Sequence, residues 1–280
     1  MKILVTGGTG YLGTHVAKYL KADDFSRKSG LDILDEKDVK MVRDYDVVVH
    51  LAAHLDKSRA GADLVFRTNV DGTINILREI KEDTAFIFAS TKDVYGPFAD
   101  NFREVPESCQ TLYAGQTALE WSKLIAERYV EYYAATRGFR SCIFRISTIY
   151  APLTEDTAPN FVGYYADAIN KGESITLPGG GVPRRDFLHV DDLAMACRAF
   201  AESIIRRGIY NIGGGTTNAS SLKGLIELME EVSGLQAVVN DAQDTEPPRP
   251  LNYISDLTLI SQEIGWMPQI SLKEGLKTLF

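Results

Sequence analysis

The fold of this chain is decided by residues 2–13, KILVTGGTGYLG. They form an apolar strand and a glycine-dense turn, and an amphipathic segment follows from His15 to Leu20. The spacing G-x-G-x-x-G begins at Gly8, the spacing G-x-x-G-x-x-G begins at Gly7, and both end at Gly13. Glycine permits a tight turn, lets backbone N–H groups approach a pyrophosphate, and lets the helix pack closely on its strand. Because the helix N-terminus also offers unpaired donors to phosphates, the stretch predicts a dinucleotide-binding turn.

Composition narrows the class of protein. The chain has 280 residues, of which 45% are hydrophobic and 24% charged, as expected for a soluble globular enzyme. A net charge of -8 argues against a nucleic-acid partner. Cys109, Cys142 and Cys197 form no CxxC pair, so neither a disulfide framework nor a metal site is indicated. The first strand leaves no room for a signal peptide and no apolar run spans a bilayer, so we expect a cytoplasmic protein without a membrane partner.

Strand-like and helix-like segments alternate in the first half. The apolar runs are Ile3–Val5, Val47–Leu51, Phe86–Ala89 and Cys142–Ile146, and the helical patterns are Leu64–Glu79 and Leu119–Ala135. Such alternation indicates crossover units. We therefore predict an α/β fold: a Rossmann-type, doubly wound parallel sheet with helices on both faces.

The second half has a different character. Residues 151–186 are rich in proline and glycine, with one helix near Val162–Asn170. Further helices are expected at Asp191–Ile205 and at Leu222–Ser233, where Gly234 ends the helix before a rigid loop at 247–250. We predict that 1–150 form the cofactor domain and that 187–212 return to it. The ranges 151–186 and 213–280 would then form a smaller, C-terminal substrate-binding lobe.

The second strand of the cofactor domain is unusually short, because only residues 21–30 are available for it. In this position Asp24 would contact a ribose diol and favour NAD. Arg27 with Lys28 would instead hold a 2′-phosphate and favour NADP. The sequence leaves the choice between NAD and NADP open.

Several separate segments resemble one family, the extended short-chain dehydrogenases/reductases, which include NAD-dependent nucleotide-sugar epimerases and dehydratases. The segments that carry the resemblance, in chain order, are 6–13, 32–33, 50–53, 69–77, 89–96, 122–127, 145–152, 185–192, 210–213 and 259–268. The resemblance implies an epimerase, dehydratase or reductase that acts on a nucleotide-sugar by hydride transfer.

The resemblance also implies roles for single residues. Those expected to bind the cofactor are Gly7, Gly10, Tyr11, Leu12 and Gly13 in the turn, Asp32 and Ile33 beside the adenine, Leu51, Ala52 and Ala53 along its central portion, Asn69, and Lys123 on the nicotinamide ribose. Thr91 would bond the reacting sugar oxygen, and the charge of Lys123 would lower the pKa of a nearby acid.

Other residues would face the substrate or serve the structure. Tyr95 would lie near the substrate, and Arg185 and Arg249 would meet the nucleotide diphosphate, which suits the fork of arginine. We expect His50 and His189 to be buried structural residues, and Lys92 with Asp93 to lie on a solvated turn.

One departure from the family is serious. Its acid/base is a tyrosine four residues before the lysine, where both side chains share one helix face, and Leu119 stands there. Tyr113 is the nearest upstream tyrosine and would reach the site if residues 111–117 fold back as a loop. Glu120 points about 100° away around the helix and is a poor substitute. Loss of general acid–base catalysis typically costs about 10²–10⁴-fold in rate.

Two functions therefore compete. The first is the nucleotide-sugar enzyme with an atypical site. The second is a catalytically impaired NAD(P)-binding protein that acts as a redox sensor or partner-binding module. In either case we expect a homodimer, since the helix from Leu119 carries more aromatic surface than one sheet contact requires, and the family commonly pairs through this helix and Leu64–Glu79.

Overall fold

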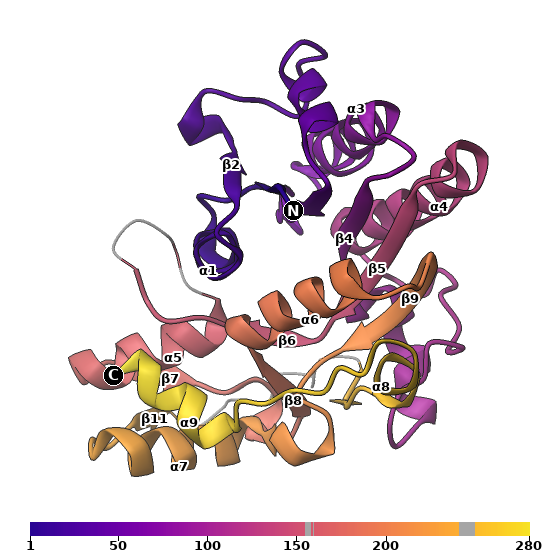
Figure 1. The fold of residues 1–280 in the computed structure, drawn as a ribbon. Coiled ribbons are helices and arrows are strands. Elements are labelled where there is room, and N and C mark those ends of the chain that lie inside the picture. Colours follow the sequence, from indigo (N-terminus) through magenta and orange to yellow (C-terminus); the bar gives the residue numbers. More distant parts are fainter. Residues whose placement is uncertain (155–157, 159, 241–249) are drawn as a thin grey trace.

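The computed structural model describes residues 1–154, 158, 160–240 and 250–280. Its centre is a six-stranded sheet in the order β2-β1-β3-β4-β5-β9, in which every neighbouring pair is parallel (Figure 1). The strands are β1 (Ile3–Thr6), β2 (Asp23–Phe25), β3 (Val47–His50), β4 (Ala85–Thr91), β5 (Arg140–Ile146) and β9 (Arg207–Ile212). All four predicted strands are present. The strand order reverses between β1 and β3, which is where open parallel sheets bind ligands.

Helices cover both faces of this sheet, as the side chains of β4 illustrate. Ile87 belongs to an apolar cluster formed with α1 (Tyr11–Leu20) and α6 (Val190–Glu202). Phe86 and Phe88 belong to a second cluster, formed with α3 (Gly72–Glu79) and α4 (Ala118–Arg137). Alternate residues of a buried strand point to opposite faces, so the doubly wound α/β prediction is confirmed.

The predicted helix Leu64–Glu79 contains an irregular turn. It consists of α2 (Ala62–Phe66), a π-helical turn at Arg67–Asp71 and then α3. Within this widened turn the hydroxyl of Thr73 donates to the backbone carbonyl of Asn69 at 2.6 Å. Such turns often mark functional sites, and this one carries Asn69.

The second strand is as short as the sequence predicts. β2 has three residues, and the chain then runs through 3₁₀ turns at Arg27–Ser29 and Asp38–Asp44 before it enters β3. Because β2 lies at the edge of the sheet, its carboxyl end is close to the glycine-rich turn that follows β1.

Smaller sheets and helices make up most of the second half. Here β8 (Arg184–His189) pairs with β6 (Thr148–Tyr150), β10 (Ala219–Ser221) and β12 (Asn252–Tyr253), and β7 (Ser174–Thr176) pairs with β11 (Val238–Asn240). The helices are α5 (Phe161–Lys171), α7 (Leu222–Ser233), α8 (Thr258–Ile264) and α9 (Leu272–Leu276). The third predicted helix, α7, ends at Gly234 in the left-handed conformation, as expected.

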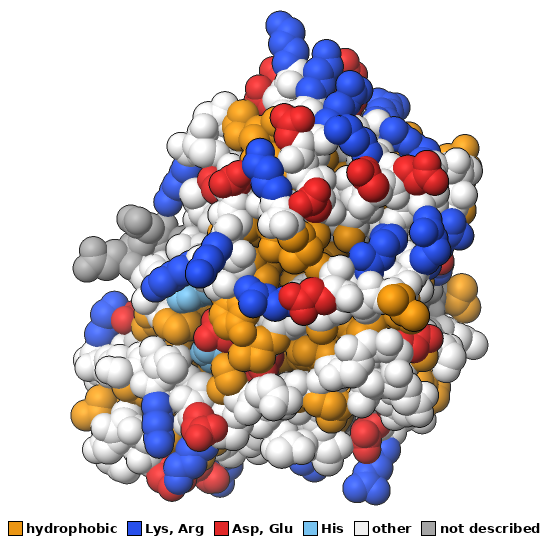
Figure 2. All heavy atoms as spheres, viewed as in Figure 1, with side chains coloured by type: hydrophobic (Ala, Val, Ile, Leu, Met, Phe, Trp, Pro, Cys, Tyr) orange, Lys and Arg blue, Asp and Glu red, His pale blue; other side chains and the backbone are white. Residues whose placement is uncertain are grey.

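α6 packs on the large sheet and β9 is one of its strands, whereas α5, α7 and α9 enclose an apolar cluster of their own. α6 ends at Glu202, three residues before the predicted end. Figure 2 shows acidic and basic side chains interspersed over the N-terminal half, and apolar side chains in a band between the two halves. Within the described ranges, no helix has the length and apolar character that crossing a bilayer requires.

Candidate active site

The glycine-rich turn lies where β1 meets α1. Gly7 has φ +73°, and a Cβ on Gly13 would lie 2.0 Å from the carbonyl oxygen of Gly7. Both positions therefore exclude side chains. α1 begins at Tyr11 after Gly10, which offers no capping side chain, and its first turn carries no acidic residue. The Gly10 N–H donates to the Gly7 carbonyl at 2.9 Å, so the amides of the first turn of α1 and the positive end of its dipole are the groups that fit a pyrophosphate in this glycine cradle.

Asp24 lies beside this cradle. Its Oδ2 accepts a hydrogen bond from the Ser26 hydroxyl at 2.7 Å, but its Oδ1 is buried without a partner. A Cβ on Gly8 would come within 2.4 Å of that Oδ1, so the carboxylate points at the turn. An unpartnered acceptor here fits the donor hydroxyls of a ribose. Arg27 and Lys28 lie on the next turn and are exposed.

The structure places one group of expected cofactor residues, Leu51 to Ala53, beside the glycine-rich turn. Ala52 packs against the turn, since a Cβ on Gly7 would lie 2.9 Å from its Cα, and its N–H donates to Thr6. Leu51 and Ala53 flank it and are half-buried.

Asp32 accepts the N–H of Leu34 at 2.9 Å, and Ile33 is buried against Gly72. Leu12 joins the core between α1 and α6. The hydroxyl of Tyr11 is already engaged, because it exchanges hydrogen bonds with the backbone of Ala151.

Lys123 is the buried cation of the site. Its Nζ donates to the carbonyl oxygen of Ala89 at 2.7 Å and lies 4.9 Å from the centre of the Phe88 ring. Burial lowers the pKa of Lys123 to about 8, against the opposing charge of Glu127. The amine is therefore close to its titration point at neutral to mildly alkaline pH.

Thr91 ends β4, two residues after the carbonyl that holds Lys123. Its hydroxyl oxygen accepts the N–H of Asp93 at 3.2 Å and caps the turn that follows. The last three residues of one strand thus place a hydroxyl and the anchor of an amine at the carboxyl edge of the sheet.

Asn69, expected beside the cofactor, bonds two neighbouring segments of the chain. Its side chain accepts the N–H of His54 at 2.7 Å and donates to the His54 carbonyl and to the Ser122 hydroxyl. It therefore ties the loop after β3 to α4, next to Lys123.

Both histidines singled out in the sequence are buried and engaged in structure. His50 lies between the hydroxyls of Thr6 and Thr73, at 2.7 and 3.0 Å. Burial, with the charge of Lys123, lowers the pKa of His50 to about 3, so the ring is neutral. His189 accepts the N–H of Asp191 at the start of α6.

The charges around Leu119 form ion pairs. Glu120 accepts the N–H of Thr117 and pairs with Lys57 at 2.7 Å. Burial raises the pKa of Glu120, but hydrogen bonds from Lys57 and Thr117 outweigh it and the net shift is downward.

The expectation that Lys92 and Asp93 lie on a solvated turn is wrong, since both are half-buried and Asp93 pairs with Lys92 and Lys57. The charges of these lysines overcome burial and lower the pKa of Asp93 well below its ordinary value. Both carboxylates thus stay ionised, so neither replaces the missing acid.

Residues 111–117 form an irregular loop ahead of α4, which is the arrangement under which Tyr113 would approach the site. Gln116 folds the loop back by donating to the carbonyl of Val94 at 3.3 Å. Tyr113 itself is 66% exposed, and its ring contacts Trp121 edge-on at 5.6 Å.

Two substrate-binding expectations need correction, and a third lies outside the described residues. Tyr95 is fully buried, with its hydroxyl donating to Asn211 at 2.7 Å, because it fills the core beneath the turn rather than facing the substrate. Arg185 is buried and clamps the backbone carbonyls of Pro250 and Leu251 at 2.9 and 2.8 Å. Its fork is thus occupied by the chain. Arg249 is the residue outside the described ranges.

Sequence reasoning missed a buried ion pair next to Lys123. Arg145, on β5, binds Glu127, on α4, with Nη2–Oε2 at 2.7 Å. The available signal was an arginine within an otherwise apolar strand, together with an acid four residues after Lys123.

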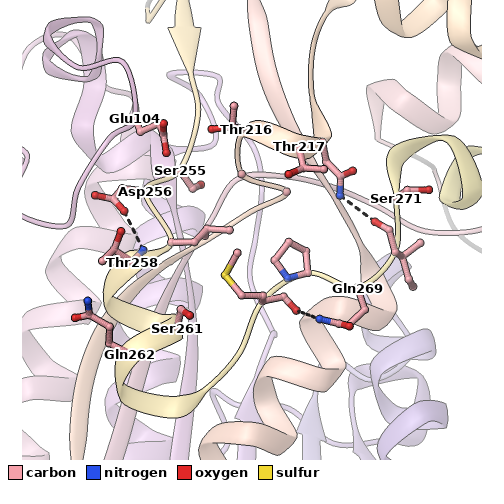
Figure 3. A pocket seen from close by; sticks show the side chains of 17 residues that line it. Glu104, Thr216, Thr217, Ser255, Asp256, Thr258, Ser261, Gln262, Gln269 and Ser271 are labelled. Atoms are coloured by element: carbon pink, nitrogen blue, oxygen red, sulfur yellow. Dashed lines mark hydrogen bonds between the residues drawn. The ribbon is translucent and has the colours of Figure 1, made fainter.

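A separate pocket of about 570 Å³ lies between the loop after β9 and the loops on either side of α8 (Figure 3). Hydroxyls, carboxamides and the carboxylates of Glu104 and Asp256 line it, and none of the described lining residues is basic. A pocket with two carboxylates and no cation does not suit a nucleoside diphosphate.

Comparison with known proteins points to one family. The sequence profile of the "NAD dependent epimerase/dehydratase family" matches residues 3–213. CDP-paratose 2-epimerase of Salmonella typhi is 27% identical, over all of this chain and 98% of the relative. That alignment runs over 335 positions, so the relative carries insertions that this chain lacks.

Solved structures superpose over the same length. UDP-glucose 4-epimerase from Thermotoga maritima, solved with UDP-glucose, has a TM-score of 0.82 at 26% identity and covers 100% of this chain and 97% of its own. UDP-glucuronic acid 4-epimerase from Bacillus cereus, solved with UDP-glucuronic acid and NAD, has a TM-score of 0.83 at 26% identity, covering 99% and 97%.

Proposed function

Because the chain belongs to the NAD dependent epimerase/dehydratase family, we propose that it is an NAD-dependent enzyme acting on a nucleotide-sugar by hydride transfer. One observation carries this proposal: Lys123 is anchored on Ala89, two residues before Thr91, at the sheet edge that also holds the glycine cradle. A hydroxyl and an amine near its titration point are what a sugar oxygen needs when it gains or loses a proton.

The cofactor residues would divide their work along the groove. The amides of Tyr11 to Gly13 would bind the pyrophosphate, Asp24 the adenosine ribose, and Lys123 the ribose at the nicotinamide end. When bound, the nicotinamide supplies a hydride acceptor and donor. We propose NAD rather than NADP, since the unpartnered oxygen of Asp24 would bond a 2′-hydroxyl and repel a 2′-phosphate.

The nucleotide-sugar proposal draws on the relatives, whose names specify CDP- and UDP-linked sugars. We propose that residues 151–186 and 213–280 bind this substrate, as a smaller lobe set against the cofactor domain. Arg249 stays a candidate for the diphosphate, whereas Arg185 would have to release two backbone carbonyls first.

Because Leu119 stands where the family has its catalytic tyrosine, we also consider a second function, that of a cofactor-binding protein without catalysis. The enzyme proposal needs a proton-exchanging group other than a tyrosine at position 119. Tyr113 is the candidate that the sequence offers, supported by the folded-back loop, although its hydroxyl would have to move inward from an exposed position.

We also propose a homodimer that pairs through α2 and α4. These helices pack against each other and leave Leu64, Tyr129 and Tyr132 exposed by 47%, 38% and 61%. Leu124 of the same helix is buried within the chain and does not contribute to this surface. Large apolar side chains on two adjacent helices are typical of an interface between copies.

Calorimetry with NAD⁺, NADH, NADP⁺ and NADPH, followed by absorbance at the nicotinamide band with CDP-, UDP-, dTDP- and GDP-sugars, tests these proposals. We expect micromolar NAD⁺ or NADH binding and slow turnover of at least one sugar. Binding without turnover favours the sensor, and no binding of any dinucleotide by folded protein refutes both functions.

A further inference from the structure

The buried pair of Glu127 and Arg145 is not used by the proposed function as stated so far. Two nitrogens of the guanidinium donate to the two carboxylate oxygens, with Nη2–Oε2 at 2.7 Å and Nε–Oε1 at 3.1 Å. Both side chains are almost completely buried. Placing two charges in the interior costs several kcal/mol per ion before their attraction offsets it, so such a pair calls for a reason.

The pair is the centre of a network that joins five elements: α4, β4, β5, β9 and the 3₁₀ turn at Lys92–Asn101 that carries Tyr95. Ser90 of β4 donates to Glu127 at 2.5 Å, and Arg145 of β5 donates to the hydroxyl of Tyr95 at 3.1 Å. Tyr95 in turn donates to Asn211 of β9. The hydrogen-bonding capacity of the Glu127 carboxylate is therefore spent on Ser90 and Arg145.

Lys123 lies directly beside this network. Glu127 follows it by four residues and so shares its face of α4. The carbonyl that holds its Nζ belongs to Ala89, and Ser90 is the next residue of the strand. The amine is thus connected to the ion pair in two ways: through one turn of α4, from Lys123 to Glu127, and through the peptide unit between Ala89 and Ser90.

The groups that face Lys123 come from three elements. β4 contributes the Ala89 carbonyl and the Phe88 ring, β3 contributes the neutral ring of His50, and α4 contributes Glu127. Among the described residues, Glu127 is the anion whose charge acts on the amine. Arg145 compensates that charge, which leaves Lys123 buried without a full counter-ion.

We propose that Lys123 itself exchanges the proton at this site in place of the missing tyrosine, and that the Glu127–Arg145 pair is the positioning element that fits it for that task. This inference rests on the proposed function. In the direction of substrate oxidation, the hydroxyl proton of the sugar passes to the neutral amine, which becomes an ammonium. The electron pair of the O–H bond becomes the second bond of the new carbonyl group, and a bound oxidised nicotinamide would supply the acceptor for the hydride lost from that same carbon. The reverse direction returns the proton from the ammonium to the oxygen.

Geometry favours Lys123 over Tyr113. Lys123 is buried, and its amine is fixed on the carbonyl of Ala89, two residues before Thr91 on the same strand. Tyr113 is exposed on a loop. A buried lysine with few opposing charges is also the known way in which proteins make an amine basic near neutral pH. The downward shift in the pKa of Lys123 to about 8 agrees with this.

NMR titration of the full chain, labelled with ¹³Cε-lysine, tests the inference without any substrate or cofactor. The Lys123 signal is assigned by its loss in Lys123→Met. We expect it to titrate about two units below the exposed lysines. A Lys123 signal that titrates together with the exposed lysines overturns the inference, whether or not any further variant folds.

Glu127→Gln and Arg145→Met form a matched pair of variants, because each breaks the same ion pair. Glu127→Gln removes the anion and lowers the pKa of Lys123, whereas Arg145→Met uncovers the anion and raises it, each by about one unit. If the pair only supports the packing, both variants should shift the pKa of Lys123 in the same direction or leave it unchanged. The double variant should return the titration toward that of the natural chain.

Turnover then links the amine to the reaction. In the oxidation direction, the rate should rise with pH through the pKa of Lys123 and move with it, downward in Glu127→Gln and upward in Arg145→Met. Tyr113→Phe should leave this limb of the profile unchanged. A fixed limb, or one abolished by Tyr113→Phe, overturns the role of Lys123. A chain that binds NAD⁺ but turns over no sugar refutes the proposed function and the proton exchange, while the NMR titration alone decides whether the pair tunes Lys123.

Discussion

Replacing Asp24 by alanine should separate cofactor affinity from stability. In the structure Oδ2 of Asp24 is bonded to Ser26, and Oδ1 is buried at the glycine-rich turn without a partner. The variant removes the acceptor that we assign to the adenosine ribose and leaves the glycine turn and α1 as they are.

The expected magnitudes follow from these contacts. A hydrogen bond to a charged group contributes about 1.5–3 kcal/mol, so NAD⁺ should bind roughly ten- to hundredfold more weakly. NADP⁺ should bind about tenfold more tightly, since two anions about 4 Å apart near a protein surface repel by a few kcal/mol before screening. Meanwhile the chain loses the hydrogen bond from Ser26 to the same carboxylate, also about 1.5–3 kcal/mol, and it loses a buried orphan oxygen that costs about 1–3 kcal/mol. These two effects nearly cancel, so the melting temperature should change little.

Isothermal titration calorimetry with NAD⁺ and NADP⁺, and thermal unfolding without cofactor, measure the two effects. Ser26→Ala is the matched control, because it removes the bond to Oδ2 and keeps the carboxylate. If Asp24→Ala binds NAD⁺ as the natural chain does, or if both cofactors weaken together with the melting temperature, then Asp24 supports the turn and does not select the cofactor.

Three further outcomes are expected. Leu119→Tyr should turn over a nucleotide-sugar roughly ten- to hundredfold faster than its size-matched control Leu119→Phe. This gain lies in the lower part of the range for acid–base catalysis, because Lys123 already exchanges the proton. Equal rates would show that position 119 does not face the reacting oxygen. Lys123→Met should raise the free energy of unfolding more at pH 7 than at pH 10.5. Because burial lowers the pKa of Lys123 from 10.5 to about 8, the unfolded chain binds more protons between these values and stability rises with pH across them; urea unfolding at both pH values checks this, and an equal gain at both would contradict it. Tyr132→Glu should weaken a dimer formed through α2 and α4, seen as a shift to monomer in sedimentation velocity, whereas the same change at the exposed Tyr164 on α5 should not.

The sheet was predictable because its signals are local. Four apolar runs and the glycine spacing fix strand identity, and parallel crossovers leave few ways to arrange such strands. Gly234 ended a predicted helix for the same reason, since a left-handed residue after a helix is a property of a few neighbouring residues.

The errors arose where a role depends on the direction of a side chain. Tyr95 and Arg185 both lie in segments that the family places near the substrate, yet Tyr95 points into the core and Arg185 holds Pro250 and Leu251. Position along the chain places the backbone of such residues. It does not determine which of two neighbouring surfaces, interior or groove, receives the side chain.

The Glu127–Arg145 pair could not be derived from the sequence because its partners meet only through the packing of α4 on β5. Replacing a buried ion pair with apolar residues of similar volume is often neutral or stabilising, so stability alone does not explain its presence. A cofactor sensor would need the glycine cradle and Asp24, but it has no use for a fixed charge balance around one buried amine. The pair is explained if Lys123 has to gain and lose a proton. Without Arg145, the charge of Glu127 would keep the amine protonated, and without Glu127, Arg145 would be unpaired in the core. The interior around Lys123 therefore favours an enzyme, even though Leu119 has removed the family's usual acid.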